Sequence, residues 1–283
     1  SRADFAMSLN KINFQALGIT QDSLVASMVL NIDGNTDMQQ THRLMGSVHS
    51  IELAMPDTTF YPLDLNLEMN TNEESILART NAGNLWLQFH SDEGLDSLLQ
   101  KTDALVRELK VQKEDRQLNY KNLKAKFPRV DFHILCGDNN PVANIMRSML
   151  GTTFNELAID LIAAPEKGVR GKAHLHKLKT AAVVLDSISL NIAQLDNGIG
   201  VMARVKNGPK NKVVNFESKL NALITPEGLK SHLLFLDDKG RKGIDLGVNV
   251  ETADSSMSVH LTPLTPILAY RTFNVNEDNF ISI

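Results

Sequence analysis

The stretch Phe216–Phe235, FESKLNALITPEGLKSHLLF, decides the fold class of this protein. Apolar residues such as Leu220 and Ile224 occupy every second position before Thr225–Gly228, and Leu233 belongs to the same pattern after it. A period of two places alternate side chains on one face of a β-strand. Pro at the second and Gly at the fourth position of Thr-Pro-Glu-Gly suit a tight turn. The stretch therefore predicts an antiparallel hairpin.

The same alternation extends in both directions from this hairpin. Toward the C-terminus it continues through 244–250 and 257–261. Toward the N-terminus it occurs at 188–192 and 199–205, which flank a turn with an Asn197-Gly198 step. We therefore expect a meander of hairpins in the second half of the chain.

The first 90 residues show the alternation less regularly. A change of phase between Leu9 and Ile12 predicts a β-bulge, because one extra residue shifts the side chains to the other face. The apolar run from Leu24 to Ile32 predicts a strand followed by a turn at 33–35. A further antiparallel hairpin is expected from the segments 63–69 and 85–89.

Helical periodicity interrupts the strands in the middle of the chain. Apolar residues at three- and four-residue spacing predict an amphipathic helix from Asp92 to Leu118, with Ser91 as its N-cap. A strand is expected at 130–136. Pro141 then opens a short helix, Val142 to Leu150, which Gly151 ends.

These elements predict a mainly β protein: an antiparallel meander that forms a curled, open or partly closed sheet with an α-helical insert. The expected regions are an N-terminal β region (1–90), a helical insert with one strand (91–151) and a C-terminal β-meander (152–283). No linker separates them, so we expect one continuous architecture, in which the insert covers an end of the sheet or plugs its open side.

The composition narrows the classes of function. The charge of −4, from 29 basic and 33 acidic residues spread along the chain, disfavours a nucleic-acid partner. Aromatic residues make up 5% with one Trp, which weighs against stacking on sugars or bases. No apolar run reaches the roughly 18 residues of a membrane span. Alternating patterns at both ends predict that the same polypeptide continues on both sides.

No chemical motif indicates an enzyme, a metal site or a cofactor. His174 and His176 share a strand face, but lysines at 172, 177 and 179 disfavour a cation there. The segment from Asp33 to Leu44 lacks the Gly and the closing Glu of a calcium loop. Cys136 alternates with apolar residues in a strand and is expected to be a buried structural thiol. We predict no catalytic residue, no metal and no cofactor.

The alternating apolar face has two interpretations. In a β-sandwich or closed barrel it is the core, with about 1.5–3 kcal/mol per buried side chain. In an open, curled sheet it lines a groove for acyl chains, whose exposure to water costs about 0.8 kcal/mol per CH₂. The alternation alone does not separate the two.

Two segments carry a resemblance to a known family. They are LTPLTPILAYRTFNVNEDNFISI (Leu261–Ile283), with its stretch Pro266–Phe273, and the hairpins of Asn221–Glu251. They resemble the periplasmic part of the TamB/AsmA-like family, particularly its very long members from Bacteroidetes. The helical insert departs from the regular groove of that family, and its anchor and C-terminal domain are not matched.

The resemblance implies the periplasmic part of an inner-membrane-anchored protein of a Gram-negative envelope, without enzymatic activity. It implies a hydrophobic β-groove that shields phospholipid acyl chains during transport to the outer membrane, with an outer-membrane barrel protein as a further partner. The groove-lining candidates are Leu220, Ile224, Leu233, Phe235, Ile244, Leu246, Val248, Val250, Val259 and Leu261.

Two other classes of function stay open from the sequence. A scaffold for outer-membrane protein assembly would accept client strands at its open sheet edges. An envelope hydrolase would need a deep polar pocket with convergent acid and base groups.

Overall fold

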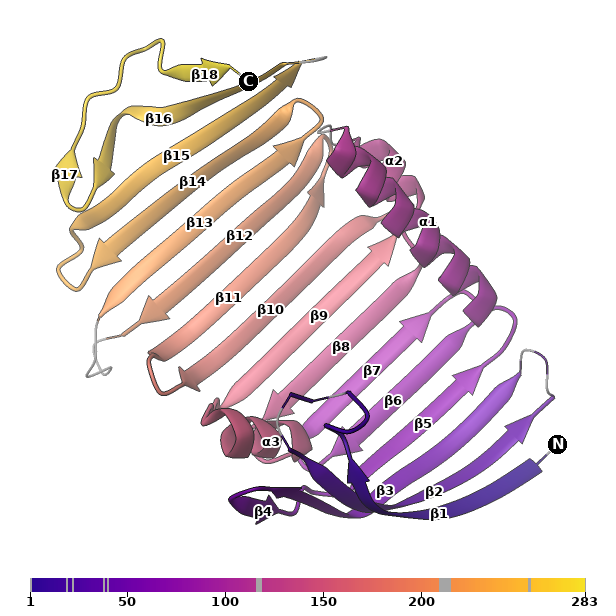
Figure 1. Ribbon diagram of the computed structural model, residues 1–283. Helices are drawn as coiled ribbons and strands as arrows, with labels where there is room; N and C mark the ends of the chain where they lie inside the picture. The colour runs from indigo at the N-terminus through magenta and orange to yellow at the C-terminus, as the bar shows by residue number, and fades with distance from the viewer. Residues whose placement is uncertain are drawn as a thin grey trace. The chain divides into compact units, whose positions relative to one another are not determined.

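The computed structural model describes residues 2–18, 20–21, 23–37, 39, 41–115, 119–208, 215–253 and 256–282. Strands make up 61% of the described residues and helices 14%. The 18 strands form one antiparallel meander sheet, which does not close into a barrel over the described residues (Figure 1). The predicted fold class is therefore confirmed.

The contacts between residues divide the chain into two units, which we describe separately. Unit 1 comprises Ser1–Leu98, Val130–Ala158 and Lys179–Ala182. Unit 2 comprises Leu99–Arg129, Ile159–Leu178 and Val183–Ile283.

Unit 1 is a sheet whose strands pair mostly in chain order. Its elements are β1 (Arg2–Asn13), β2 (Val25–Thr36), β3 (His42–Met55), β4 (Thr58–Phe60), β5 (Leu65–Thr71), β6 (Ile76–Ala82), β7 (Leu85–Ser91), β8 (Val130–Gly137) and α3 (Pro141–Leu150). Both β4 and β5 pair with β3, at different parts of its length. All other neighbours from β1 to β8 are consecutive antiparallel pairs.

The register of unit 1 confirms one sequence prediction and corrects two. The β1–β2 register shifts between Leu9 and Ile12, so the predicted bulge is confirmed. The turn predicted at 33–35 is wrong, because these residues continue β2 and pair with both β1 and β3. The hairpin predicted from 63–69 and 85–89 is also wrong, because β6 lies between β5 and β7.

The small side chains of β6 explain the missed strand. Its residues facing the apolar side include Ala78, Thr80 and Ala82, which pair with Met69, Leu67 and Leu85. These residues give a weak hydrophobic alternation, although they fit the pleated sheet well. Pairing on both sides, and not residue type, makes this segment a strand.

Helix α3 covers one end of the apolar face of unit 1. Pro141 stands in its first turn, and Gly151 ends it in the left-handed conformation with φ 58°, as predicted. Ile145 and Met149 pack on a buried cluster of Leu24, Ala26 and Leu53. The same cluster contacts partly buried residues of the neighbouring strands and loop: Phe14, Met28, Ile51, Met55 and Phe60.

A buried asparagine joins α3 to the β6–β7 turn. Asn140 is fully buried, and its side-chain oxygen accepts a hydrogen bond from the Ala143 amide at 2.9 Å, so it caps α3. Its Nδ2 donates to Asn84 Oδ1 at 2.9 Å and to the Gly137 carbonyl at 2.8 Å. The hydrogen bonds of this one side chain therefore connect a helix, a strand and a turn.

We predict that Asn140→Ala lowers the free energy of unfolding by about 2–3 kcal/mol, because it removes the cap and leaves buried polar partners unpaired. Urea denaturation followed by circular dichroism measures the change. Ser148→Ala, at an exposed position of α3, is the control and is expected to change it by less than about 0.5 kcal/mol. Equal stabilities of the two variants would contradict the role given to Asn140.

Unit 2 combines two helices with a long meander. Its elements are α1 (Leu95–Glu114, whose first turn belongs to unit 1), α2 (Tyr120–Ala125), β9 (Glu156–Ala164), β10 (Gly168–Lys179), β11 (Val184–Leu195), β12 (Gly198–Asn207), β13 (Phe216–Thr225), β14 (Gly228–Asp237), β15 (Lys242–Ala253), β16 (Ser256–Leu268), β17 (Arg271–Thr272) and β18 (Phe280–Ser282). The hairpins predicted around 194–198 and 225–228 are confirmed. Residues 254–255, in the turn expected before 257–261, lie outside the described residues.

Hydrogen bonds from polar side chains hold α1 against α2. The buried Gln112 side chain donates to the Asn119 carbonyl at 2.9 Å and accepts from the Asn119 amide at 2.8 Å. Glu108 accepts hydrogen bonds from Lys126 and Gln112, which lower the pKa of its carboxyl. Asn119 also caps α2 through the Asn122 amide. These bonds set the short connection between the helices, of which residues 116–118 lie outside the described residues.

The start of the predicted long helix needs a correction. Ser91 is not its N-cap, because Ser91 is buried at the end of β7, where it pairs with Ile76 and Val130. The helix begins at Leu95 instead. Its apolar residues Leu95, Leu99, Val106 and Leu109 are exposed, while Leu98 and Leu105 are half-buried. Whether the insert covers or plugs the sheet stays a prediction.

Candidate functional site

The ten groove-lining candidates lie on one face of the meander from β13 to β16. Leu220 pairs with Leu233, and Leu233 pairs in turn with Leu246. Directly opposite residues of antiparallel strands share a face, so these three form one row across the sheet. The neighbouring rows contain the other candidates: Ile224, Val250 and Val259; Phe235 and Ile244; Val248 and Leu261.

Strands β11 and β12 extend this apolar face. Ala203 pairs with Leu220, and Val201 pairs with Ala222, while Leu190 and Ile192 oppose Ala203 and Val201 on β11. These residues alternate in the sequence as the candidates do, but they are not among the ten residues predicted to line the groove. Alternation within one strand does not show which strand lies beside it, so only the pairing of β12 with β13 places these residues on the same face as the candidates.

A serine on the apolar face has its hydroxyl satisfied by the backbone. Ser231 lies between Ala222 and Val248, and its Oγ donates to the Val248 carbonyl at 3.1 Å. A satisfied hydroxyl presents less polarity to a ligand than a free one. This face therefore exposes less hydrogen-bonding capacity than the presence of a serine in the sequence implies.

The side chains of this face are not covered as a core would be. Leu220 is 38% exposed, and the other nine candidates are half-buried, so none of the ten is fully buried. In a closed sandwich or barrel, such rows would be sealed by a second layer. The structure instead presents an apolar surface that is accessible from one side.

The outer edge of β16 is occupied by the C-terminal segment. The stretch 266–273 forms a hairpin in which Ala269 and Tyr270 take positive φ values of 49° and 65°, and Leu268 pairs with Arg271. Pro266 is fully buried. Strand β18 pairs with the other end of β16, between His260 and Phe280. The segment that carries the family resemblance thus covers an edge of the sheet.

The opposite face of unit 2 carries charged networks. Glu217 contacts Arg204 at 2.6 Å and Lys219 at 3.0 Å. Burial raises the pKa of the Glu217 carboxyl, but these two cations outweigh burial and lower it overall. Asp245 contacts Lys242 at 2.6 Å and His232 at 2.7 Å. The opposite face therefore combines charged groups, which the candidate rows lack, with apolar side chains such as Met202, which is 56% exposed.

Hydrogen bonds from Lys242 and His232 lower the pKa of Asp245, so this carboxylate stabilises the fold above about pH 4 and the contribution is lost as pH falls through the lower folded-state pKa. We expect the melting temperature of Asp245→Asn to decline less steeply between about pH 5 and pH 3 than that of the unmodified protein. Lys242→Met is expected to flatten the profile similarly, since Lys242 is the main donor. Parallel profiles would contradict this assignment.

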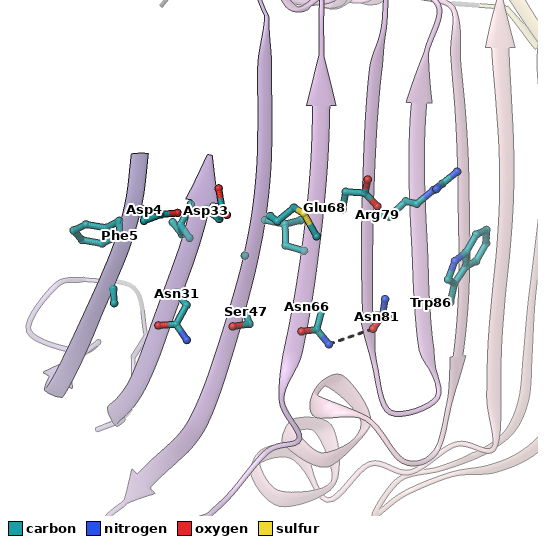
Figure 2. Close-up of a pocket in the computed structure, with 15 residues that line it drawn as sticks. Asp4, Phe5, Asn31, Asp33, Ser47, Asn66, Glu68, Arg79, Asn81 and Trp86 are labelled. Carbon is teal, nitrogen blue, oxygen red and sulfur yellow. Dashed lines mark hydrogen bonds between the residues drawn. The ribbon is translucent and has the colours of Figure 1, made fainter. Parts of the chain in front are cut away.

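Two open depressions lie on the faces of the units opposite to the alternating apolar rows. In unit 2, a depression of about 540 Å³ is lined by polar residues such as Asn191 and His232, by apolar residues such as Leu195, Met202 and Leu223, and by none of the ten candidates. In unit 1, a depression of about 730 Å³ crosses the strands from β1 to β7 (Figure 2). Sequence reasoning missed both, because it followed the apolar positions only.

The reactive side chains that the sequence offered, Cys136 and the pair His174 and His176, lie on β8 and β10. Cys136 is 1% exposed, as expected for a structural thiol, and burial raises the pKa of its thiol, which disfavours the thiolate. His174 and His176 lie on one face of β10 with their rings 6.1 Å apart. Over the described ranges, no three His, Cys, Asp or Glu residues gather as metal ligands would.

The chain matches no protein-family model, no curated protein and no solved structure. The resemblance to the TamB/AsmA-like family therefore stays a prediction that depends on the two quoted segments. In the part of the chain that the structure describes, no helix combines the length and the apolar character needed to cross a bilayer.

Proposed function

We propose that the apolar face of β11–β16 shields the acyl chains of phospholipids. The observation that supports this proposal most directly is the set of ten apolar side chains that share one face, none of which is fully buried. The opposite face carries Glu217, Asp245 and their cationic partners. Such a two-sided sheet suits contact with hydrocarbon on one side and water on the other.

The free energy of hydration provides the driving force. Removing one CH₂ group from water gains about 0.8 kcal/mol, so a 16-carbon chain gains on the order of 12 kcal/mol when it is fully shielded. Aliphatic side chains such as Leu233, Leu246 and Val248 make non-directional contacts. A lipid tail would therefore slide along the face without a deep specific minimum.

The biological setting of the proposal comes from the family resemblance. In that setting the chain is a segment of an inner-membrane-anchored periplasmic protein that carries phospholipids from the inner to the outer membrane. The aliphatic face would form part of its conduit, and an outer-membrane barrel protein would be a partner. The activity would be non-enzymatic.

The assembly-scaffold alternative depends on open sheet edges. At β16 the edge already pairs with β17 and β18, and Pro263 and Pro266 remove two backbone donors from that strand. A client strand would have to displace the C-terminal segment there. This observation favours lipid shielding over strand addition at β16.

We predict that a photoreactive amino acid at Leu246 or Val259 captures phospholipid in cells, because both positions belong to the apolar face. Mass spectrometry of the crosslinked protein identifies the captured species. The matched controls are Lys230 and Asn249, which lie on the opposite face of β14 and β15. Capture at all four positions alike, or at none, would argue against the proposal.

The neighbouring residues Leu233 and Leu234 allow a second test. Both are half-buried on β14 but point to opposite faces. We expect Leu233→Asn to weaken the binding of a fluorescent long-chain fatty acid about tenfold, because it places an amide in the central apolar row. Leu234→Asn is expected to leave the affinity within about twofold. A similar loss in both variants would indicate a change in stability instead of a binding face.

A further inference from the structure

The depression of unit 1 contains a row of hydrogen-bonding side chains. Asn31, Ser47, Asn66 and Asn81 are direct cross-strand neighbours on β2, β3, β5 and β6. Figure 2 shows them side by side across the sheet. The backbone of Ile32, Gly46 and Leu67 forms the floor between this row and the next. All side chains of the row therefore point to the same side of the sheet.

The single tryptophan of the chain ends this row. Trp86 on β7 pairs directly with Asn81, and its side chain is 41% exposed. The ring of His133 stacks against the indole at 6.3 Å between centroids. The same face presents two further exposed apolar side chains, Met45 within the depression (53% exposed) and Leu135 beside Trp86 (48% exposed), so apolar surface accompanies the polar row. The place of Trp86 beside four polar side chains indicates a ligand with both hydroxyl groups and apolar C–H surfaces.

A second row adds charges to the depression. Asp33, Glu68 and Arg79 flank the amide row, and Asp4 extends it onto β1. Arg2 contacts Asp33 at 3.1 Å, and Arg79 Nε donates to Gln88 Oε1 at 3.1 Å. The four ionisable groups that line the depression carry three negative charges and one positive charge at neutral pH. This balance disfavours anionic ligands.

The amides of the row keep hydrogen-bonding capacity. Asn66 Nδ2 donates to Asn81 Oδ1 at 3.4 Å, and Asn31 Nδ2 contacts His49 Nε2 at 2.8 Å. A carboxamide has two N–H donors and two acceptor lone pairs, so these contacts use only part of what the row offers. Glu68 Oε1 accepts a hydrogen bond from Asn70 Nδ2 at 3.1 Å, and since a carboxylate has two oxygens with two lone pairs each, acceptor capacity remains for ligand hydroxyls.

We infer that this depression binds a neutral, extended oligosaccharide. Neighbouring strands lie about 4.8 Å apart, which is close to the length of one pyranose residue in an extended glycan. The amide row would therefore meet successive sugar residues in register. Trp86 would stack on the C–H face of a sugar ring, since the indole face is electron-rich.

This inference is independent of the proposed lipid function, because the row uses the polar side of unit 1. It also revises the expectation from composition. A low count of aromatic residues disfavours carbohydrate binding on average, but one ring suffices where the fold places it at the end of a polar row.

The single tryptophan makes the test direct. We expect chitohexaose or cellohexaose, added to the whole protein, to change the fluorescence of Trp86 in a saturable way. The hexamers are expected to bind at least about tenfold more tightly than the dimers, because several subsites lie along the row. A hyaluronan hexasaccharide, which is anionic, is expected to bind more weakly. The absence of a signal and of binding heat for both neutral hexamers would overturn the inference.

Variants separate a binding site from a structural role. Asn66→Ala and Glu68→Gln are expected to weaken hexamer binding about tenfold, and calorimetry is expected to show a similar or larger loss for Trp86→Ala. Trp86→Phe keeps an aromatic face and is expected to recover part of the affinity. Tyr61→Ala removes a 70% exposed aromatic ring outside the depression and is expected to change nothing. Equal losses in Trp86→Ala and Tyr61→Ala, or tighter binding of the anionic hexamer, would overturn the assignment.

Discussion

Backbone hydrogen bonding between neighbouring antiparallel strands is the constraint on which the rest of this structure depends. Each strand from β11 to β16 pairs with the next in a defined register. Because side chains alternate with a period of two, the register of one pair decides which side chains of the next strand share its face. The turns at 196–197 and 226–227 transmit this register without a slip.

The two faces that result have different chemistry and different neighbours. In unit 1, α3 covers one end of the apolar face, where Leu24, Ala26 and Leu53 are buried. In unit 2, the rows around Leu233 stay half-exposed. The polar sides carry ion pairs around Glu217 and Asp245 in unit 2 and the amide row in unit 1. The same alternating strands therefore yield a hydrocarbon-compatible surface and a hydrogen-bonding surface.

Much of the fold was predictable from local patterns. The hairpin at 225–228 combined clear alternation with a Pro-Gly turn sequence, and α3 combined Pro141 with Gly151, so both were predicted correctly. Other segments were not, because their local signals conflict with their pairing. Asp33-Gly34-Asn35 resembles a turn but is held in β2 by partners on both sides, and Ser91 resembles an N-cap but completes β7.

The sequence by itself determined the period of the strands, the turns at 194–198 and 225–228 and the composition of the alternating apolar face, since these properties depend on residues close together in the chain. It also placed the ten candidates on one face, because parity follows from alternation once the turns are known. Only the tertiary structure decided that this face is not sealed as a core and that β6 lies between β5 and β7. It also decided that Trp86 lies at the end of a row formed by three asparagines and one serine, each from a different strand. These features depend on which strands become neighbours, and that choice is made by pairing between residues far apart in the sequence.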